Sequence, residues 1–77
     1  MEERKMTFGE KAVGLNFNPS GDPTVNQFKQ LYAQIIDGCN NCREKATSPE
    51  IKRLYSIAIT EAQAAQMWAV MAATWKD

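Results

Sequence analysis

The sequence contains no histidine and only two cysteines among its 77 residues. The missing histidine removes the commonest general base and the commonest metal ligand from the set of available side chains. Nine Lys and Arg residues balance nine Asp and Glu residues, and this zero net charge argues against broad binding of DNA or RNA, which requires a basic surface. We therefore predict no catalytic residues, no metal site, no cofactor and no DNA or RNA partner.

Long apolar runs are also missing. The longest run, residues 67–73, is far shorter than the ~20 residues that span a bilayer. No apolar run follows the charged N-terminal residues, so the pattern of a secretory signal is not present. We expect a protein without a membrane segment that resides in a reducing cytoplasm.

The two cysteines form the motif Cys39-Asn-Asn-Cys42. This spacing occurs in redox pairs and in half of a zinc site. Here no strand–helix–strand pattern surrounds the motif and no second pair of ligands exists. Both cysteines fall on an apolar helical stripe, so we interpret them as small buried or half-buried thiols.

Two long helices are predicted, over residues 23–45 and 49–75. Asp22-Pro23 and Ser48-Pro49 each supply an N-cap residue followed by proline at the first helical position. Gly38 interrupts the first segment and weakens it by about 1 kcal/mol relative to alanine. The apolar residues of the first segment recur every three or four positions, as in a helix, and are Val25, Phe28, Leu31, Tyr32, Ile35, Ile36, Cys39 and Cys42.

The predicted fold is all-α, with one domain over residues 1–77. Residues 1–22 form an N-terminal arm, in which residues 1–5 are expected to be frayed. Three glycines and a turn at 18–21 predict residues 7–22 to be irregular. The two helices form an antiparallel hairpin. The second helix is apolar on two faces, and one partner helix covers only one of them. We therefore expect a compact helical homo-oligomer.

The arm offers a candidate binding site. Nucleobases stack on aromatic rings and cations pair with phosphates. The alternative for the aromatic rings is that they staple the arm to the helices, and the alternative for the helix lysine is a solvated surface charge. The candidates are Phe8, Phe17, Asn16, Ser20, Lys11 and, at the start of the first helix, Lys29.

Polar residues interrupt the apolar second helix at Thr60, Gln63 and Gln66. They are either ordinary surface positions or the lining of a small polar pocket on a symmetry axis, where one residue is used several times.

Several segments resemble a family of small phage proteins, the anti-CBASS cyclic-oligonucleotide sponges. The segments are GLNFNPSG (14–21), VNQFK (25–29), AITEAQ (58–63) and MWAV (67–70), and the resemblance spans residues 8–75. CBASS is a bacterial defence in which an infected cell makes cyclic nucleotide signals that activate a killing effector. A sponge binds the signal without degrading it.

The resemblance implies a hexamer that acts in the cytoplasm of the infected host and binds cyclic dinucleotides, such as 3′,3′-cyclic GMP–AMP, between protomers. It implies that Lys29 contacts the phosphate region and that an aromatic residue of the arm stacks on a base, with Phe8 as first choice and Phe17 as second. Some members also bind cyclic trinucleotides on three-fold axes. Thr60 and Gln63 are candidates for that pocket, although Met71 stands where the family commonly has arginine.

Two alternative functions remain open. The first is a small helical adaptor that binds another protein through Trp68 and Trp75. The second is an enzyme that hydrolyses the signal, which the missing histidine and the missing acidic cluster disfavour.

Overall fold

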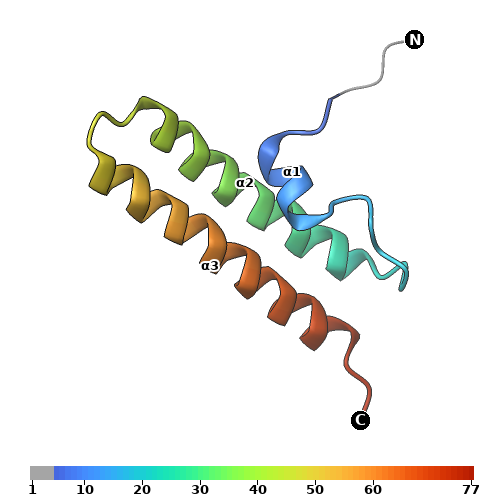
Figure 1. The fold of residues 1–77 in the computed structure, drawn as a ribbon. Coiled ribbons are helices and arrows are strands. Elements are labelled where there is room, and N and C mark those ends of the chain that lie inside the picture. Colours follow the sequence, from blue (N-terminus) through green and yellow to red (C-terminus); the bar gives the residue numbers. More distant parts are fainter. Residues whose placement is uncertain (1–4) are drawn as a thin grey trace.

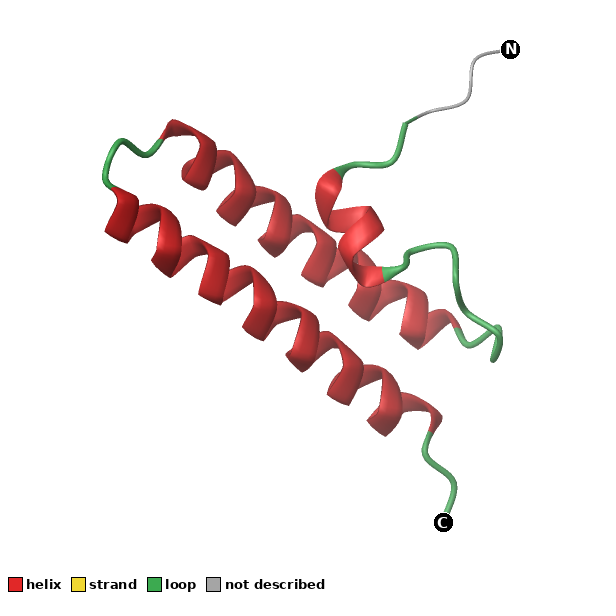
Figure 2. Ribbon diagram, viewed as in Figure 1, coloured by secondary structure: helices red, strands yellow, loops and turns green. Residues whose placement is uncertain are grey.

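The computed structural model describes residues 5–77 and contains helices α1 (Phe8–Val13), α2 (Pro23–Lys45) and α3 (Pro49–Thr74). Helices α2 and α3 lie side by side and antiparallel, and α1 lies across α2 (Figure 1). Within the described range every regular element is a helix (Figure 2). The predicted all-α helical hairpin is therefore confirmed, while what was predicted for residues 1–4 of the arm lies outside the described range.

Helix α1 corrects the predicted arm. Residues 8–13 are helical, so the prediction that this part of the arm is irregular is wrong. A capping box begins the helix: the Glu10 backbone N–H donates to the Thr7 hydroxyl at 3.1 Å, and the Thr7 N–H donates to the Glu10 carboxylate at 2.8 Å. Gly14 ends it with a positive φ of 63°. The Thr-x-x-Glu spacing was the sequence signal for this helix.

Gly9 sets how closely α1 crosses α2. A Cβ atom at this position would lie 2.1 Å from the carbonyl oxygen of Ala33, so only glycine permits the crossing. The Gly9 N–H also donates to the Asp37 carboxylate at 2.6 Å. Together these contacts hold α1 against the middle of α2 and fix where the following residues 14–22 lie.

The long helices begin where their caps predict. The Asp22 carboxylate accepts from the Thr24 N–H at 2.9 Å, and the Ser48 hydroxyl accepts from the Ile51 N–H at 3.3 Å. Helix α2 covers the predicted range and runs through Gly38 without a break. Helix α3 ends at Thr74, one residue before the predicted end.

Cys39 is half-buried and Cys42 is exposed, and both thiols are free. The prediction of a buried or half-buried thiol is therefore confirmed for Cys39 and wrong for Cys42.

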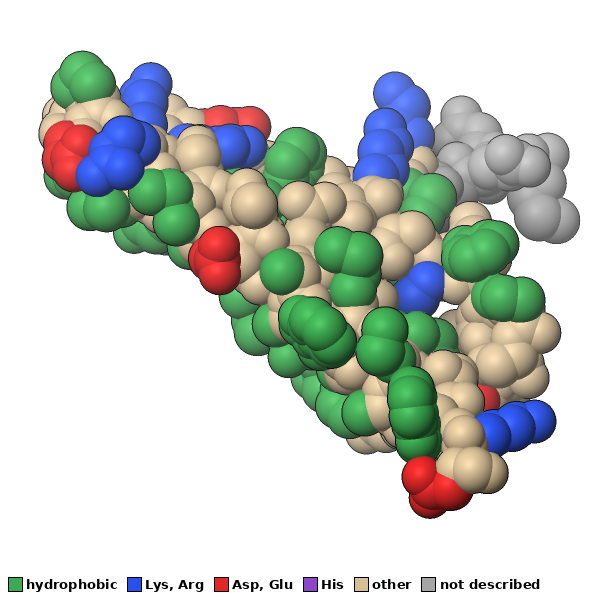
Figure 3. All heavy atoms as spheres, turned by 60° about the horizontal axis from the view of Figure 1, so that its bottom comes forward, with side chains coloured by type: hydrophobic (Ala, Val, Ile, Leu, Met, Phe, Trp, Pro, Cys, Tyr) green, Lys and Arg blue, Asp and Glu red, His purple; other side chains and the backbone are tan. Residues whose placement is uncertain are grey.

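The core of the single chain is small, and much apolar surface stays uncovered. Apolar side chains gather over α3 (Figure 3). In the described residues no helix is both long and apolar enough to cross a membrane. The buried apolar residues are Val13, Val25, Ala33, Ile36 and Ile59, whereas the large apolar residues that remain exposed are Phe8, Phe17, Leu31, Ile35, Ile51, Leu54, Ile57, Met67, Trp68, Met71 and Trp75.

Candidate functional site

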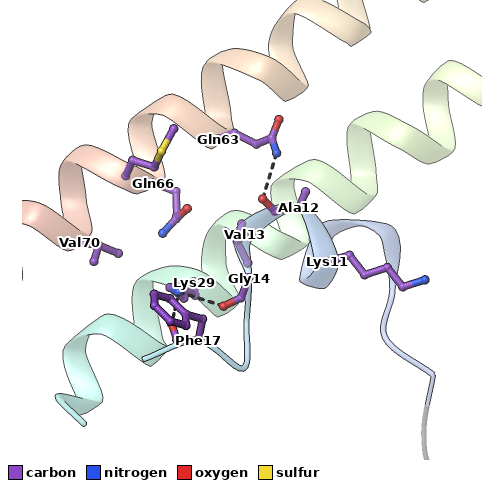
Figure 4. Close-up of a pocket in the computed structure, with 10 residues that line it drawn as sticks. Lys11, Ala12, Val13, Gly14, Phe17, Lys29, Gln63, Gln66 and Val70 are labelled. Atoms are coloured by element: carbon purple, nitrogen blue, oxygen red, sulfur yellow. Dashed lines mark hydrogen bonds between the residues drawn. The ribbon is translucent and has the colours of Figure 1, made fainter. Parts of the chain in front are cut away.

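A groove of about 530 Å³ lies where the end of α1 meets α2 and α3, in the size range of small-molecule sites (Figure 4). The crossing of α1 over α2 forms one wall, and α3 forms the other. The residues that line the groove come from all three helices and the turn after α1, and they are Lys11, Ala12, Val13, Gly14, Phe17, Lys29, Gln63, Gln66, Met67 and Val70.

Lys29 lies at the base of this groove and is only 5% exposed. Its ammonium group donates to the carbonyl oxygens of Gly14, at 2.9 Å, and Phe17 (Figure 4). An ammonium group has three N–H donors, and no described residue accepts from the third. The alternative of a solvated surface charge is therefore wrong for this lysine. Burial lowers the pKa of Lys29 below its ordinary value, because desolvation disfavours the charged form.

The groove is electropositive. Lys29 supplies this charge, and no Asp or Glu is found among the lining residues in the described part of the chain. Lys11 also lines the groove from the last turn of α1, but its side chain extends away from Lys29 (Figure 4). A buried charge without a countercharge is costly in a protein interior. The groove therefore favours an anionic ligand such as a phosphate group.

Phe17 offers its ring beside this charge. The side chain is 71% exposed, and the Lys29 ammonium lies 5.6 Å from the centre of the ring. Lys29 holds Phe17 through the backbone carbonyl, which leaves the ring face available for stacking. Phe17 also lines two neighbouring hollows, one with Ser20 and the other with Lys11 and Asn16. The structure thus places four of the other predicted site residues, Lys29, Lys11, Asn16 and Ser20, in the hollows that Phe17 lines.

The structure does not bring Phe8 to Lys29. Phe8 opens α1 at its other end and is 44% exposed, with the Arg43 guanidinium 5.5 Å from the centre of its ring. Arg43 in turn donates to Ser56 on α3 at 3.0 Å and to Asn40 at 2.7 Å. In the single chain this cluster belongs to the packing of the helices, and Phe8 lines none of the three hollows around Phe17.

The polar residues of the arm largely bind each other. The Ser20 hydroxyl donates to the side-chain Oδ1 of Asn18 at 2.7 Å and accepts from the Asp22 backbone N–H at 3.1 Å. The Asn18 amide donates to the Asp22 carbonyl at 3.0 Å and to Asn26 at 3.1 Å. These bonds fix the turn that leads into α2. Asn16 stays exposed, with a contact of 3.6 Å to the sulfur of Met6.

Gln63 and Thr60, the two residues predicted for a second pocket, lie in different places on α3. Gln63 lies in the groove and donates to the Ala12 carbonyl at 3.0 Å, which ties α3 to α1 (Figure 4). Thr60 is exposed and donates to the Ser56 carbonyl of its own helix at 3.2 Å. Thr60 does not line the groove in which Gln63 lies.

Sequence reasoning missed the contribution of α3 to the groove. In the sequence Gln66 shows only as a polar interruption of an apolar helix, and Met67 and Val70 only as part of the segment MWAV. Together with Gln63 they follow the spacing i, i+3, i+4, i+7, which places four residues on one helical face. This spacing predicts that the four residues share one face of the helix, but it does not show which other element packs against that face.

Comparison with known families gives a match over most of the chain. The family model described as Acb2/Tad1, hairpin domain, matches residues 10–74, which include α2, α3 and the residues around the groove. No curated protein and no solved structure matches the chain.

Proposed function

This chain belongs to the Acb2/Tad1 hairpin family, whose members are cyclic-oligonucleotide sponges of the anti-CBASS protein 2 type, and from that premise we propose that it binds cyclic dinucleotides in the groove at Lys29. Sequestering the signal without cleaving it keeps it from the effectors of CBASS immunity. The proposed place of action is the cytoplasm of the infected host, where the signal is made. Cyclic dinucleotides such as 3′,3′-cyclic GMP–AMP are the proposed ligands.

The observation that carries this proposal is the buried charge of Lys29. The residue is 5% exposed, two backbone carbonyls accept two of the N–H donors of its ammonium, and no carboxylate lines the groove within residues 5–77. A phosphate oxygen of the ligand accepts from the remaining N–H and supplies the missing negative charge. Charge-assisted bonds of this kind are shorter and stronger than neutral ones.

We propose Phe17 as the ring that stacks on a base. Its distance to Lys29 places an aromatic face and a cation next to each other, as a nucleotide with a base and a phosphate requires. Phe8, the first choice from sequence, lies beside Arg43 instead and is the comparison residue for the tests below.

The ligand and the uncovered apolar surface both favour a homo-oligomer. A cyclic dinucleotide has two phosphates and two bases, whereas one chain offers one Lys29 and one Phe17, so two copies related by a two-fold axis supply a full set. The large apolar side chains that are exposed outside the groove in the described part of the chain supply the contact surface. A hexamer, as the family resemblance implies, is the proposed assembly.

The second candidate function is a helical adaptor for another protein. The observation that favours it is the exposure of Trp68 (69%) and Trp75 (66%), since tryptophan is enriched in protein interfaces. The two functions differ in what occupies the groove. A sponge binds a cyclic dinucleotide at Lys29, whereas an adaptor leaves Lys29 without a ligand.

The test is ligand depletion followed by recovery. The purified protein is mixed with 3′,3′-cyclic GMP–AMP, the protein is removed by ultrafiltration, and free ligand is measured by chromatography before and after the retained protein is denatured. Depletion with full recovery of intact ligand supports the sponge. Conversion to a linear product supports an enzyme, and no depletion by the folded protein favours the adaptor.

A further inference from the structure

Gln66 on α3 is a buried polar residue whose side chain has no hydrogen-bond partner among residues 5–77. It is 5% exposed and lines the groove beside Lys29 (Figure 4). Its neighbour Gln63 donates to the backbone of α1, but among the described residues none forms a hydrogen bond with the carboxamide of Gln66. The two glutamines are one helical turn apart on the same face and are used differently.

The side chain of Gln66 is accessible from the groove. Every fully buried side-chain nitrogen and oxygen in the described part of the chain has a hydrogen-bond partner. The Gln66 carboxamide has none, so its polar atoms are reached from outside, and the groove is the space that this side chain lines. A ligand in the groove can therefore form hydrogen bonds with this carboxamide without first breaking a bond inside the chain.

We infer that Gln66 reads the N7 edge of the bound base, the edge that carries N6 in adenine and O6 in guanine, and selects adenine; this inference rests on the proposed function. A carboxamide presents one donor and one acceptor side by side. Adenine presents the complementary pair, the N6 amino group next to N7, whereas guanine presents two acceptors, N7 and O6, on that edge. Both polar atoms of Gln66 are satisfied by adenine, and one of them faces an acceptor in guanine.

The positions of the other groove residues agree with this role. Phe17 offers a ring face to the base, Lys29 offers its ammonium to the phosphate, and Gln66 stands on the opposite wall, which α3 provides (Figure 4). Met67 and Val70, one and four positions after Gln66 on α3, also line the groove and are apolar, so the carboxamide competes with few other polar groups for the base edge.

The experiment compares two ligands on two proteins by calorimetry. The ligands are cyclic di-AMP and the same ring with unsubstituted purine bases, which lack the N6 amino group. The wild-type protein is expected to bind cyclic di-AMP at least about tenfold more tightly, whereas Gln66→Met binds both within about twofold. Gln27→Met, an exposed change outside the groove, is the matched control and keeps the wild-type preference. Cyclic di-GMP is expected to bind the wild-type protein more weakly than cyclic di-AMP.

Equal binding of the two ligands by the wild-type protein overturns the inference without any variant, so a poorly folded Gln66→Met protein does not obscure the result. A preference that persists in the folded variant, or tighter binding of cyclic di-GMP, also overturns it. If 3′,3′-cyclic GMP–AMP binds but these differences are missing, only the inference fails. If no cyclic dinucleotide binds the folded wild-type protein, the proposed function fails and the inference with it.

Discussion

The Lys29 ammonium donates to the Gly14 carbonyl oxygen at 2.9 Å, so one buried charge on α2 holds the end of α1 and faces the groove. The two roles are compatible because the group has three donors and the chain uses two of them. The same contact explains why a nearly buried lysine keeps a fixed position before any ligand arrives. A pre-formed site of this kind avoids part of the ordering cost of binding.

The first prediction compares two aromatic rings. Phe17→Ala is expected to weaken binding of 3′,3′-cyclic GMP–AMP by about tenfold, about 1.4 kcal/mol, because it removes the stacking face. The bond from Lys29 to residue 17 goes to its backbone carbonyl and survives the change. Phe8→Ala is the matched control and is expected to stay within about twofold in affinity. A larger loss from Phe8→Ala than from Phe17→Ala, measured by calorimetry, would contradict the assignment.

The second prediction concerns pH. Burial lowers the pKa of Lys29, and only the protonated form attracts a phosphate. Affinity is therefore expected to fall as the pH rises through this lowered value, at a less alkaline pH than an ordinary lysine would show. Lys29→Arg stays charged over that range and, to the extent that it binds, is expected to show a flat profile. A wild-type profile that is equally flat would exclude Lys29 as the ligand cation.

The lowered pKa of Lys29 also determines how the stability of the ligand-free protein changes with pH. Since the folded chain has the lower pKa, the unfolded chain binds the proton more strongly. The contribution of Lys29 to the free energy of unfolding thus increases with pH between the folded and the unfolded pKa values. Urea unfolding of the wild-type protein and of Lys29→Met, measured at several pH values between the two pKa values, isolates this contribution. The free energy of unfolding of the wild-type protein is expected to rise with pH relative to that of the variant.

The third prediction contrasts two glycines. Gly9→Ala is expected to destabilise the protein by about 1–3 kcal/mol or more, because the new methyl group would lie 2.1 Å from the Ala33 carbonyl oxygen. Gly38→Ala meets no atom within 4 Å and is expected to stabilise helix α2 by up to about 1 kcal/mol. Urea unfolding measures both changes. Equal effects of the two variants would mean that α1 does not cross α2 as closely as described.

The fourth prediction tests self-association. Trp68→Asp places a charge in the exposed apolar surface of α3 and is expected to shift the protein toward monomer, measured by light scattering on a sizing column. Gln27→Asp introduces the same charge at an exposed site of α2 and is expected to leave the mass unchanged. A monomeric wild-type protein that still binds cyclic dinucleotide would refute a site shared between copies.

The long helices were predictable because their signals are local. Asp22-Pro23 and Ser48-Pro49 begin α2 and α3, and apolar spacing extends them. Helix α1 was missed because six residues are too few to show helical periodicity, although its Thr7 and Glu10 formed a recognisable capping box.

The site was predictable only in part. Lys29, Phe17 and Lys11 were chosen for their chemistry and meet in one groove. The burial of Lys29 depends on where Gly14 and Phe17 fold back over α2, and a contact between segments that far apart has no local signature. The role of Gln66 likewise depends on the neighbouring helix, since the sequence shows only a polar residue in an apolar stretch.

The central claim is tested most directly by calorimetric titration of 3′,3′-cyclic GMP–AMP into the wild-type protein, Lys29→Met and Lys52→Met. Lys52 is exposed on α3 and gives the same chemical change away from the groove. The account predicts one ligand per two chains, at least about a tenfold loss for Lys29→Met and no more than about a twofold change for Lys52→Met. Equal affinity of the wild-type protein and a folded Lys29→Met variant would contradict it.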